Sequence, residues 1–114
     1  MIIHRKTMKV ELKDKLREGE GRASVTHLVP AETRRHCSFF AEVSLEPGSS
    51  IGRHDHPQDI EYYIILRGTG TVNDNGSEVT VRKGDVVITG NGSFHDIKST
   101  GPGMLDMIAV IMDL

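Results

Sequence analysis

Apolar and polar residues alternate along parts of this chain with the two-residue period of a β-strand. Between residues 39 and 46, one set of alternate positions holds Phe39, Ala41, Val43 and Leu45, and the other holds Phe40, Glu42, Ser44 and Glu46. Side chains two apart lie on the same face of a strand, so the first set predicts a face that is buried in a core. Residues 104–112 repeat the pattern, with Leu105, Met107, Ala109 and Ile111 in alternation.

Turn-forming residues divide the chain at short intervals. They occur at residues 46–48, 74–76, 83–85, 90–92 and 101–103, and each group contains glycine. Asn75-Gly76 is the strongest signal, because this pair favours a two-residue β-hairpin turn; we expect strands over 71–74 and 78–82, with another over 86–89. The pattern predicts an all-β fold of eight to ten short strands, and it leaves open whether they form a sandwich or a barrel.

One segment, Val10 to Glu18, departs from this alternation. Leu12 and Leu16 are four residues apart among Lys, Glu and Asp residues, which is the spacing of a short amphipathic helix. The following Gly19-Glu20-Gly21 is typical of a helix end. We therefore expect one short helix near the N-terminus.

Length and charge limit the classes of function. A chain of 114 residues is long enough for one core but not two, so residues 1–114 are expected to form a single domain. With 14 Lys and Arg against 16 Asp and Glu, there is no strong positive field to attract nucleic acid. No apolar run reaches signal-peptide or membrane-span length, and Cys37 has no internal disulfide partner. We expect a cytoplasmic protein with neither nucleic acid nor membrane as a partner.

Three histidines and one glutamate form a candidate metal site. His54 and His56 are two apart in an extended segment, so their imidazoles project to the same side. Residues 57–59 supply a bend that can turn the carboxylate of Glu61 back toward them, and His95 follows the glycine-rich turn at 90–92. Imidazole nitrogens with one carboxylate suit Mn, Fe, Ni, Co or Zn better than Ca or Mg.

Around these residues the sequence resembles the two motifs of the cupin superfamily. The first motif, G-x5-H-x-H-x3,4-E-x6-G, is matched at every fixed position, by Gly48, His54, His56, Glu61 and Gly68. The second, G-x5-P-x-G-x2-H-x3-N, is matched at Gly84, Gly92 and His95 and departs from the pattern at Gly90 and Ser99. Residues 48–68 and 84–99 therefore carry the resemblance, and the ligand set is intact in both motifs.

The resemblance implies a fold and an assembly. Cupins are double-stranded β-helices, also called jelly-roll barrels, with the metal held inside. Cupins of this length commonly form dimers through N-terminal strands, so a homodimer is expected whose interface contains the N-terminal extension, residues 1–30.

The resemblance also implies a leading function. Oxalate decarboxylase and germin-like oxalate oxidase hold manganese with three histidines and one glutamate, so we expect Mn²⁺ and an oxalate decarboxylase-like lyase acting on oxalate or a similar small carboxylate. Four protein ligands on a six-coordinate ion leave two positions for its oxygens. Because the cupin fold hosts many activities, two alternatives stay open: an iron-dependent dioxygenase on a small organic acid or thiol, and a non-catalytic sugar- or small-molecule-binding module.

Other residues bear on the substrate. Tyr63, two after Glu61, is expected to face the interior, where its hydroxyl could bond a substrate oxygen; Phe94 and Ile97 are candidates for the pocket wall. The arginine that precedes the HxH pair by three residues in oxalate decarboxylase is replaced by Ile51, and the parity of Arg53 predicts that it points away from the metal. No segment matches that family's acidic lid, so no catalytic acid or base is assigned.

Overall fold

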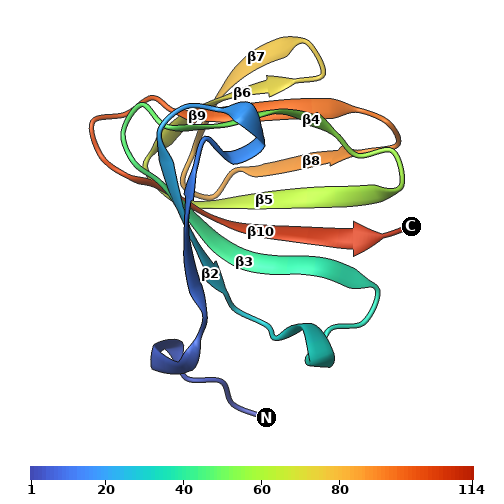
Figure 1. Cartoon of the computed structure of the whole chain (residues 1–114). Coiled ribbons are helices and arrows are strands. Elements are labelled where there is room, and N and C mark those ends of the chain that lie inside the picture. The colour runs from blue at the N-terminus through green and yellow to red at the C-terminus, as the bar shows by residue number, and fades with distance from the viewer.

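The chain folds into ten strands in two antiparallel sheets, as a computed structural model describing residues 1–114 shows (Figure 1). The larger sheet has the order β1 (Val10–Asp14), β2 (Arg22–His27), β3 (Cys37–Leu45), β10 (Leu105–Asp113), β5 (Asp59–Arg67), β8 (Val86–Gly90). The smaller sheet has the order β4 (Ser50–Asp55), β9 (Phe94–Ser99), β6 (Thr69–Asp74), β7 (Ser77–Arg82). From β3 to β6 and again from β7 to β10, consecutive strands alternate between the sheets, which is how a jelly roll encloses an interior.

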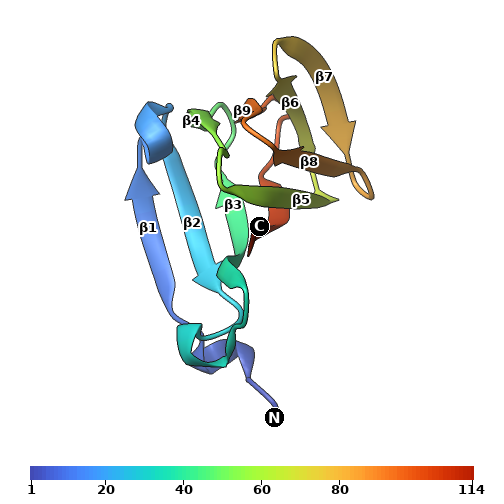
Figure 2. The ribbon, with the colours of Figure 1, turned by 90° about the vertical axis from the view of Figure 1, so that its right-hand side faces the viewer.

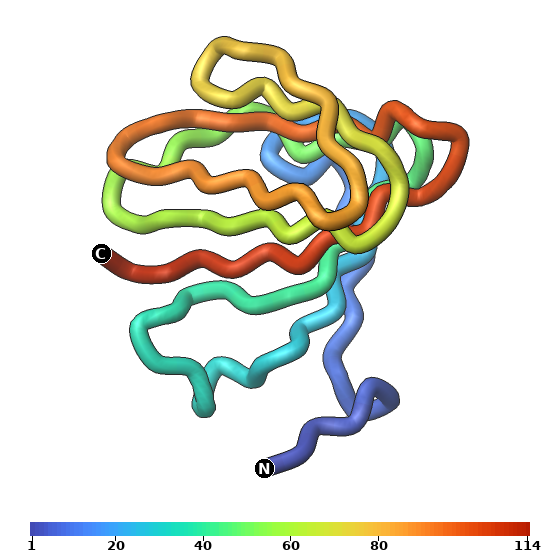
Figure 3. The backbone as a smooth tube through the Cα atoms, turned by 180° about the vertical axis from the view of Figure 1, so that it is seen from behind, coloured from blue at the N-terminus to red at the C-terminus, as the bar shows by residue number.

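Three short 3-10 turns complete the structure: η1 (Arg5–Thr7), η2 (Leu16–Glu18) and η3 (Ala31–Thr33). No helix has the length and apolar character needed to cross a membrane. Figure 2 shows the β1–β2 hairpin on one side of the molecule and the β6–β7 hairpin on the other. Seen from behind, the C-terminal strand runs between β3 and β5, and the N-terminus lies apart from it (Figure 3).

The core lies between the inner faces of the two sheets. The alternation predicted for β3 is confirmed, since Ala41, Val43 and Leu45 are at most 2% exposed. In β10, Leu105, Met107 and Ala109 are similarly buried, and the smaller sheet adds Ile51, Val72, Val81 and Ile97. Apolar side chains from both sheets therefore form one core, and the polar site lies beside them.

The hairpin predicted at Asn75-Gly76 is also confirmed. The two residues have φ angles of 49° and 103°, and Asp74 pairs with Ser77 across the turn. Positive φ at both central positions is the conformation that lets a two-residue turn follow the twist of its strands. β6 and β7 are thereby held in register at the edge of the smaller sheet.

The predicted N-terminal helix is wrong. Val10–Asp14 forms the edge strand β1, paired residue for residue with β2, and only Leu16–Glu18 forms a single 3-10 turn. Nine residues are too few for a stable helix without tertiary packing, whereas β2 offers every residue of β1 a pairing partner. The glycines taken as a helix end belong to the tip of this hairpin, where Gly21 has a φ of 67°.

The two departures from the second motif are accommodated by local packing. A Cβ at Gly90 would lie 2.7 Å from Ile60 Cγ1, so glycine gives β5 room to approach. Ser99 is 1% exposed, and its hydroxyl donates to the carbonyl of Gly103 at 3.4 Å. Its backbone also bonds with residues 48 and 49, so the end of β9 stays fixed next to the start of β4.

Candidate metal centre

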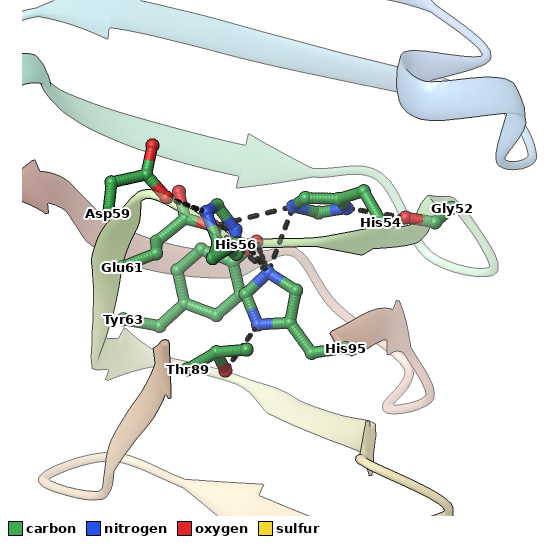
Figure 4. Close-up of polar contacts among 8 residues, drawn as sticks. All are labelled: Gly52, His54, His56, Asp59, Glu61, Tyr63, Thr89 and His95. Carbon is green, nitrogen blue, oxygen red and sulfur yellow. Dashed lines mark hydrogen bonds and ion pairs between the residues drawn. The ribbon is translucent and has the colours of Figure 1, made fainter. Parts of the chain in front are cut away.

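Three strands and one loop bring the four predicted ligands together. His54 lies in β4, His56 directly after it, Glu61 in β5 and His95 in β9. β4 pairs with β9 so that His54 and His95 are direct neighbours, while the bend before β5 returns Glu61 to the same point. Figure 4 shows the three imidazoles and the carboxylate converging, and their ligand atoms all lie within 4.8 Å of one another.

The spacing of these atoms matches that of donors around a single ion. The Nε2 atom of His95 is 2.9 Å from His54 Nε2 and 3.3 Å from His56 Nε2. Glu61 Oε1 lies 2.9 Å from His95 Nε2, 3.1 Å from His56 Nε2 and 3.4 Å from His54 Nε2. Donors bonded to one ion at about 2.1 Å are about 3.0 to 3.4 Å apart, depending on octahedral or tetrahedral angles.

Each imidazole is oriented by a bond to its other nitrogen. His54 Nδ1 donates to the carbonyl of Gly52 at 2.8 Å, and His56 Nδ1 donates to Asp59 Oδ1 at 2.7 Å. His95 Nδ1 lies 2.8 Å from the hydroxyl of Thr89. A carbonyl and a carboxylate only accept, so the neutral rings of His54 and His56 carry their proton on Nδ1 and present a lone pair at Nε2.

These tautomers make the cluster unfavourable without a cation. The Nε2 lone pairs of His54 and His56 lie 3.4 and 3.1 Å from Oε1 of the Glu61 carboxylate, and they repel it unless a proton or a metal ion lies between them. Glu61 and His95 are 5% and 0% exposed, so water cannot relieve the repulsion. The donor set thus fits a divalent metal, with the Nε2 atoms of His54, His56 and His95 and Oε1 of Glu61 as ligands.

The pKa values show which protons a metal would displace. Burial raises the pKa of Glu61, but the hydrogen bonds that protonated imidazoles donate to it outweigh burial and hold that pKa far below its usual range. The hydrogen bond to Glu61 raises the pKa of His56 despite burial, and Asp59 adds to the increase. Burial lowers the pKa of His95. Glu61 is therefore a permanent carboxylate, and a proton on His56 competes with the metal.

Tyr63 packs against the cluster as predicted from its position two after Glu61. Its ring stacks on His95 with centroids 4.9 Å apart and planes 9° from parallel. Its hydroxyl is 3.4 Å from His95 Nε2, and burial together with the charge of Glu61 raises its pKa well above 10.0, so it remains a neutral donor. Tyr63 fixes the His95 ring and directs an O–H group toward the site.

A cavity of about 160 Å³ opens beside the cluster. His54, Glu61 and Tyr63 supply its polar wall. Its apolar wall comes from β3, β4 and β10: Phe39, Val43, Ile51, Ala109 and Ile111. Leu16 and Arg17, from the tip of the β1–β2 hairpin, complete it. The size suits a ligand of a few heavy atoms.

The other two predicted pocket residues lie elsewhere. Phe94 faces the side opposite to His95 and packs under Arg53, whose guanidinium carbon is 3.6 Å from the ring centroid. Arg53 thus points away from the metal cluster, as its parity predicts. Ile97 is fully buried in the core and does not line the cavity.

Sequence reasoning missed three residues around the cluster that no fixed position of the motifs specifies. Asp59 had a signal, because it lies three residues after His56, but we interpreted it only as part of a bend. Thr89 is a polar residue at an inward position of β8, which is a weaker signal. Arg17 gave none, since it is 37 residues before His54 and lies outside both motifs.

The fold and the site together define a small jelly-roll protein with a candidate centre of three histidines and one glutamate. The chain belongs to the cupin family: the family model described as Cupin domain matches residues 41–111. The family resemblance seen in the two motifs is therefore confirmed.

Similar proteins include one described as an oxalate-binding protein from Thermotoga maritima, 36% identical over 113 residues that cover 98% of this chain and 93% of the relative. TcmJ, a tetracenomycin polyketide synthase protein of Streptomyces glaucescens, is 27% identical over 72% of this chain and 55% of its own length. A crystal structure of a predicted oxalate decarboxylase from Thermotoga maritima superposes with a TM-score of 0.94, at 36% identity and full coverage of both chains. A sugar phosphate isomerase of the cupin superfamily from Silicibacter pomeroyi shares the fold at 18% identity and a TM-score of 0.81, over the whole of this chain and 76% of its own.

Proposed function

We propose that this protein binds one divalent metal ion, Mn²⁺, and uses it to bind a small dicarboxylate such as oxalate, as an oxalate decarboxylase-like cupin. The observation that carries the proposal is the convergence of three Nε2 atoms and one ionised carboxylate, in which the neutral rings of His54 and His56 have no N–H to donate to Glu61. The descriptions of the Thermotoga maritima matches, as an oxalate-binding protein and as a predicted oxalate decarboxylase, support the ligand class.

The residues of the chain have distinct parts in this function. A bound metal ion supplies a Lewis acid, and in manganese cupins a one-electron centre, for carboxylate oxygens. Gly52, Asp59 and Thr89 keep the imidazoles pointed at one position. The apolar wall of the cavity limits access of water, and Tyr63 presents a neutral hydroxyl that can donate to an oxygen of the bound carboxylate.

Binding is the main activity we propose, and turnover is expected to be slow. Decarboxylation of oxalate to formate and carbon dioxide needs a proton at the carbon that loses carbon dioxide. The only carboxylate that lines the cavity is Glu61, which belongs to the ligand set, and the pKa of Tyr63 is raised. Neither group is suited to deliver that proton quickly near neutral pH.

Metal analysis and product analysis test the proposal. Purified protein is expected to contain close to one equivalent of metal, with manganese preferred in competition, and to lose it in Glu61→Gln. His36→Asn, which replaces an exposed histidine outside the cluster, is the matched control and keeps the metal. A wild-type protein that takes up no metal when Mn²⁺, Fe²⁺ and Zn²⁺ are supplied contradicts the proposed site.

The same preparation separates the alternatives. Incubation with oxalate is expected to give formate without hydrogen peroxide, whereas peroxide would indicate an oxidase. Preference for iron with oxygen uptake on an organic acid or thiol would favour the dioxygenase. A protein that is fully stable without metal and binds sugars in place of carboxylates would favour the non-catalytic module.

We also propose that the protein is a cytoplasmic homodimer, with residues 1–30 in the interface. Val10 and Leu12 in the edge strand β1 are 57% and 67% exposed, which leaves an apolar strip on the segment expected to meet the partner copy. Light scattering is expected to give twice the mass of the chain, and Leu12→Glu to shift it toward the monomer. Val79→Glu, at an exposed position outside this segment, is the control; a monomeric wild type overturns the assignment.

A further inference from the structure

We propose that Arg17 binds the second carboxylate of the ligand, so that the cavity selects dianions over monoanions. This inference deepens the proposed function and rests on it. It concerns a residue outside both cupin motifs, brought to the metal cluster by the tip of the β1–β2 hairpin.

The position of Arg17 supports this role. It lines the same 160 Å³ cavity as His54, Glu61 and Tyr63. No hydrogen bond or ion pair in the protein engages its side chain, although Arg5, Arg22 and Arg67 all pair with carboxylates. The guanidinium is therefore available to a ligand.

The backbone around Arg17 is held in a strained conformation. Lys15, Arg17 and Glu18 have φ angles of 50°, 54° and 63°, in the left-handed region that residues with a Cβ seldom adopt. Such conformations persist only where the surroundings impose them, and they concentrate at functional sites. Three of them within four residues indicate that the hairpin tip is fixed in one specific position.

Contacts with β4 impose that position. In Figures 1 and 2 the tip lies over β4, and the structure shows why it can approach so closely. A Cβ at Gly52 would lie only 2.0 Å from the carbonyl oxygen of Arg17, so the absence of a side chain there makes room for it. Ser50 and Glu20 lock the tip further, through bonds of 2.8 Å from each backbone N–H to an oxygen of the other residue.

The charge balance points to a dianion. A divalent ion held by three neutral imidazoles and one carboxylate retains a single net positive charge, and Arg17 adds a second. A monocarboxylate neutralises only the first. A short dicarboxylate neutralises both, with one carboxylate at the ion and the other at the guanidinium, whose planar N–H groups match carboxylate geometry. The apolar remainder of the wall gives no polar partner to a sugar.

Calorimetric titration of the manganese-loaded protein with oxalate and with acetate tests this assignment. Arg17→Gln is expected to weaken oxalate binding about tenfold. This is the lower end of the range expected for loss of a hydrogen bond to a charged group, because Arg17 is exposed to solvent. Acetate binding and the affinity for Mn²⁺ are expected to stay unchanged, and Arg17→Lys to recover part of the loss. Arg17→Asn removes the charge with a residue that tolerates positive φ, and is expected to behave as Arg17→Gln does.

Arg53→Gln is the matched control, because Arg53 is adjacent to His54 in sequence but stacks on Phe94 on the opposite face. It is expected to bind oxalate as the wild type does. Equal oxalate affinity in wild type and Arg17→Gln would overturn the Arg17 assignment and leave the proposed function intact. Parallel losses of oxalate, acetate and Mn²⁺ affinity would also overturn it, by showing a structural role. A wild type that binds no dicarboxylate would overturn the proposed function and this inference together.

Discussion

Thr89 offers a sharp test of how the metal cluster is organised. Its hydroxyl lies 2.8 Å from His95 Nδ1, and the two residues are 1% and 0% exposed. His95 can present a lone pair at Nε2 only if Nδ1 carries the proton and donates it to Thr89. Thr89→Val keeps the shape of the side chain and removes the acceptor, so it isolates this one bond.

Two effects of different size are expected. In metal-free protein, a buried Nδ1–H without a partner costs about 1 to 3 kcal/mol of the free energy of unfolding. In metal binding, loss of the bond that orients a ligand typically reduces affinity about 10- to 100-fold. The stacking of His95 on Tyr63 keeps part of the orientation, which favours the lower half of that range.

Denaturant unfolding in the presence of a chelator measures the first effect, and competition with a chromophoric chelator for Mn²⁺ measures the second. Thr80→Val, the same exchange at an exposed position of β7, is the control and should change neither quantity by more than about 0.5 kcal/mol. If Thr89→Val binds Mn²⁺ as tightly as the control does, the idea that the outer hydrogen bond prepares His95 for coordination is refuted.

Two further predictions concern protons and packing. The hydrogen bond to Glu61 raises the pKa of His56 above 6.5, and a protonated His56 cannot coordinate a metal. The apparent affinity for Mn²⁺ should therefore be constant above that pKa and fall about tenfold per pH unit below it. A flat chelator-competition profile down to pH 5 would contradict this prediction. Gly52→Ala should lower the free energy of unfolding by about 1 to 3 kcal/mol, because its Cβ would lie 2.0 Å from the carbonyl oxygen of Arg17. Gly103→Ala, which meets open space, is the matched control, and equal denaturation midpoints for the two variants would show that the hairpin tip is not packed as described.

The parts of the site that could be predicted from the sequence are those whose geometry is local. His54 and His56 are two apart on one strand, and Glu61 follows one bend later, so strand periodicity is enough to bring three ligands together. His95 lies far along the chain, but a glycine-rich turn and the motif spacing mark it. The alternation in β3 and β10 predicted the core for the same reason.

The parts that could not be predicted depend on how the strands pair and how the two sheets face each other. Leu12 and Leu16 have helical spacing, and nothing within their segment reveals that β2 will pair with it and leave Leu12 67% exposed. In the sequence, Thr89 looks like an ordinary strand residue. Only the fold shows that it lies against His95. Strand pairing decided the first outcome and packing of one sheet against the other decided the second, and single-sequence periodicity records neither.

Gly52 takes part both in the local geometry of the metal cluster and in a contact with a segment distant in sequence. It lies between the first glycine of the motif and His54, at a position where the motif specifies no residue, yet its carbonyl orients the His54 ring and its missing Cβ admits the Arg17 backbone. The same residue of β4 therefore orients a candidate metal ligand and makes room for the hairpin that carries Arg17, the candidate anion-binding residue. Movement of the hairpin tip would be transmitted to His54 through this peptide. Substitutions of Gly52 should therefore change both the metal affinity and the dicarboxylate affinity, whereas substitutions of the Arg17 side chain should change the dicarboxylate affinity alone.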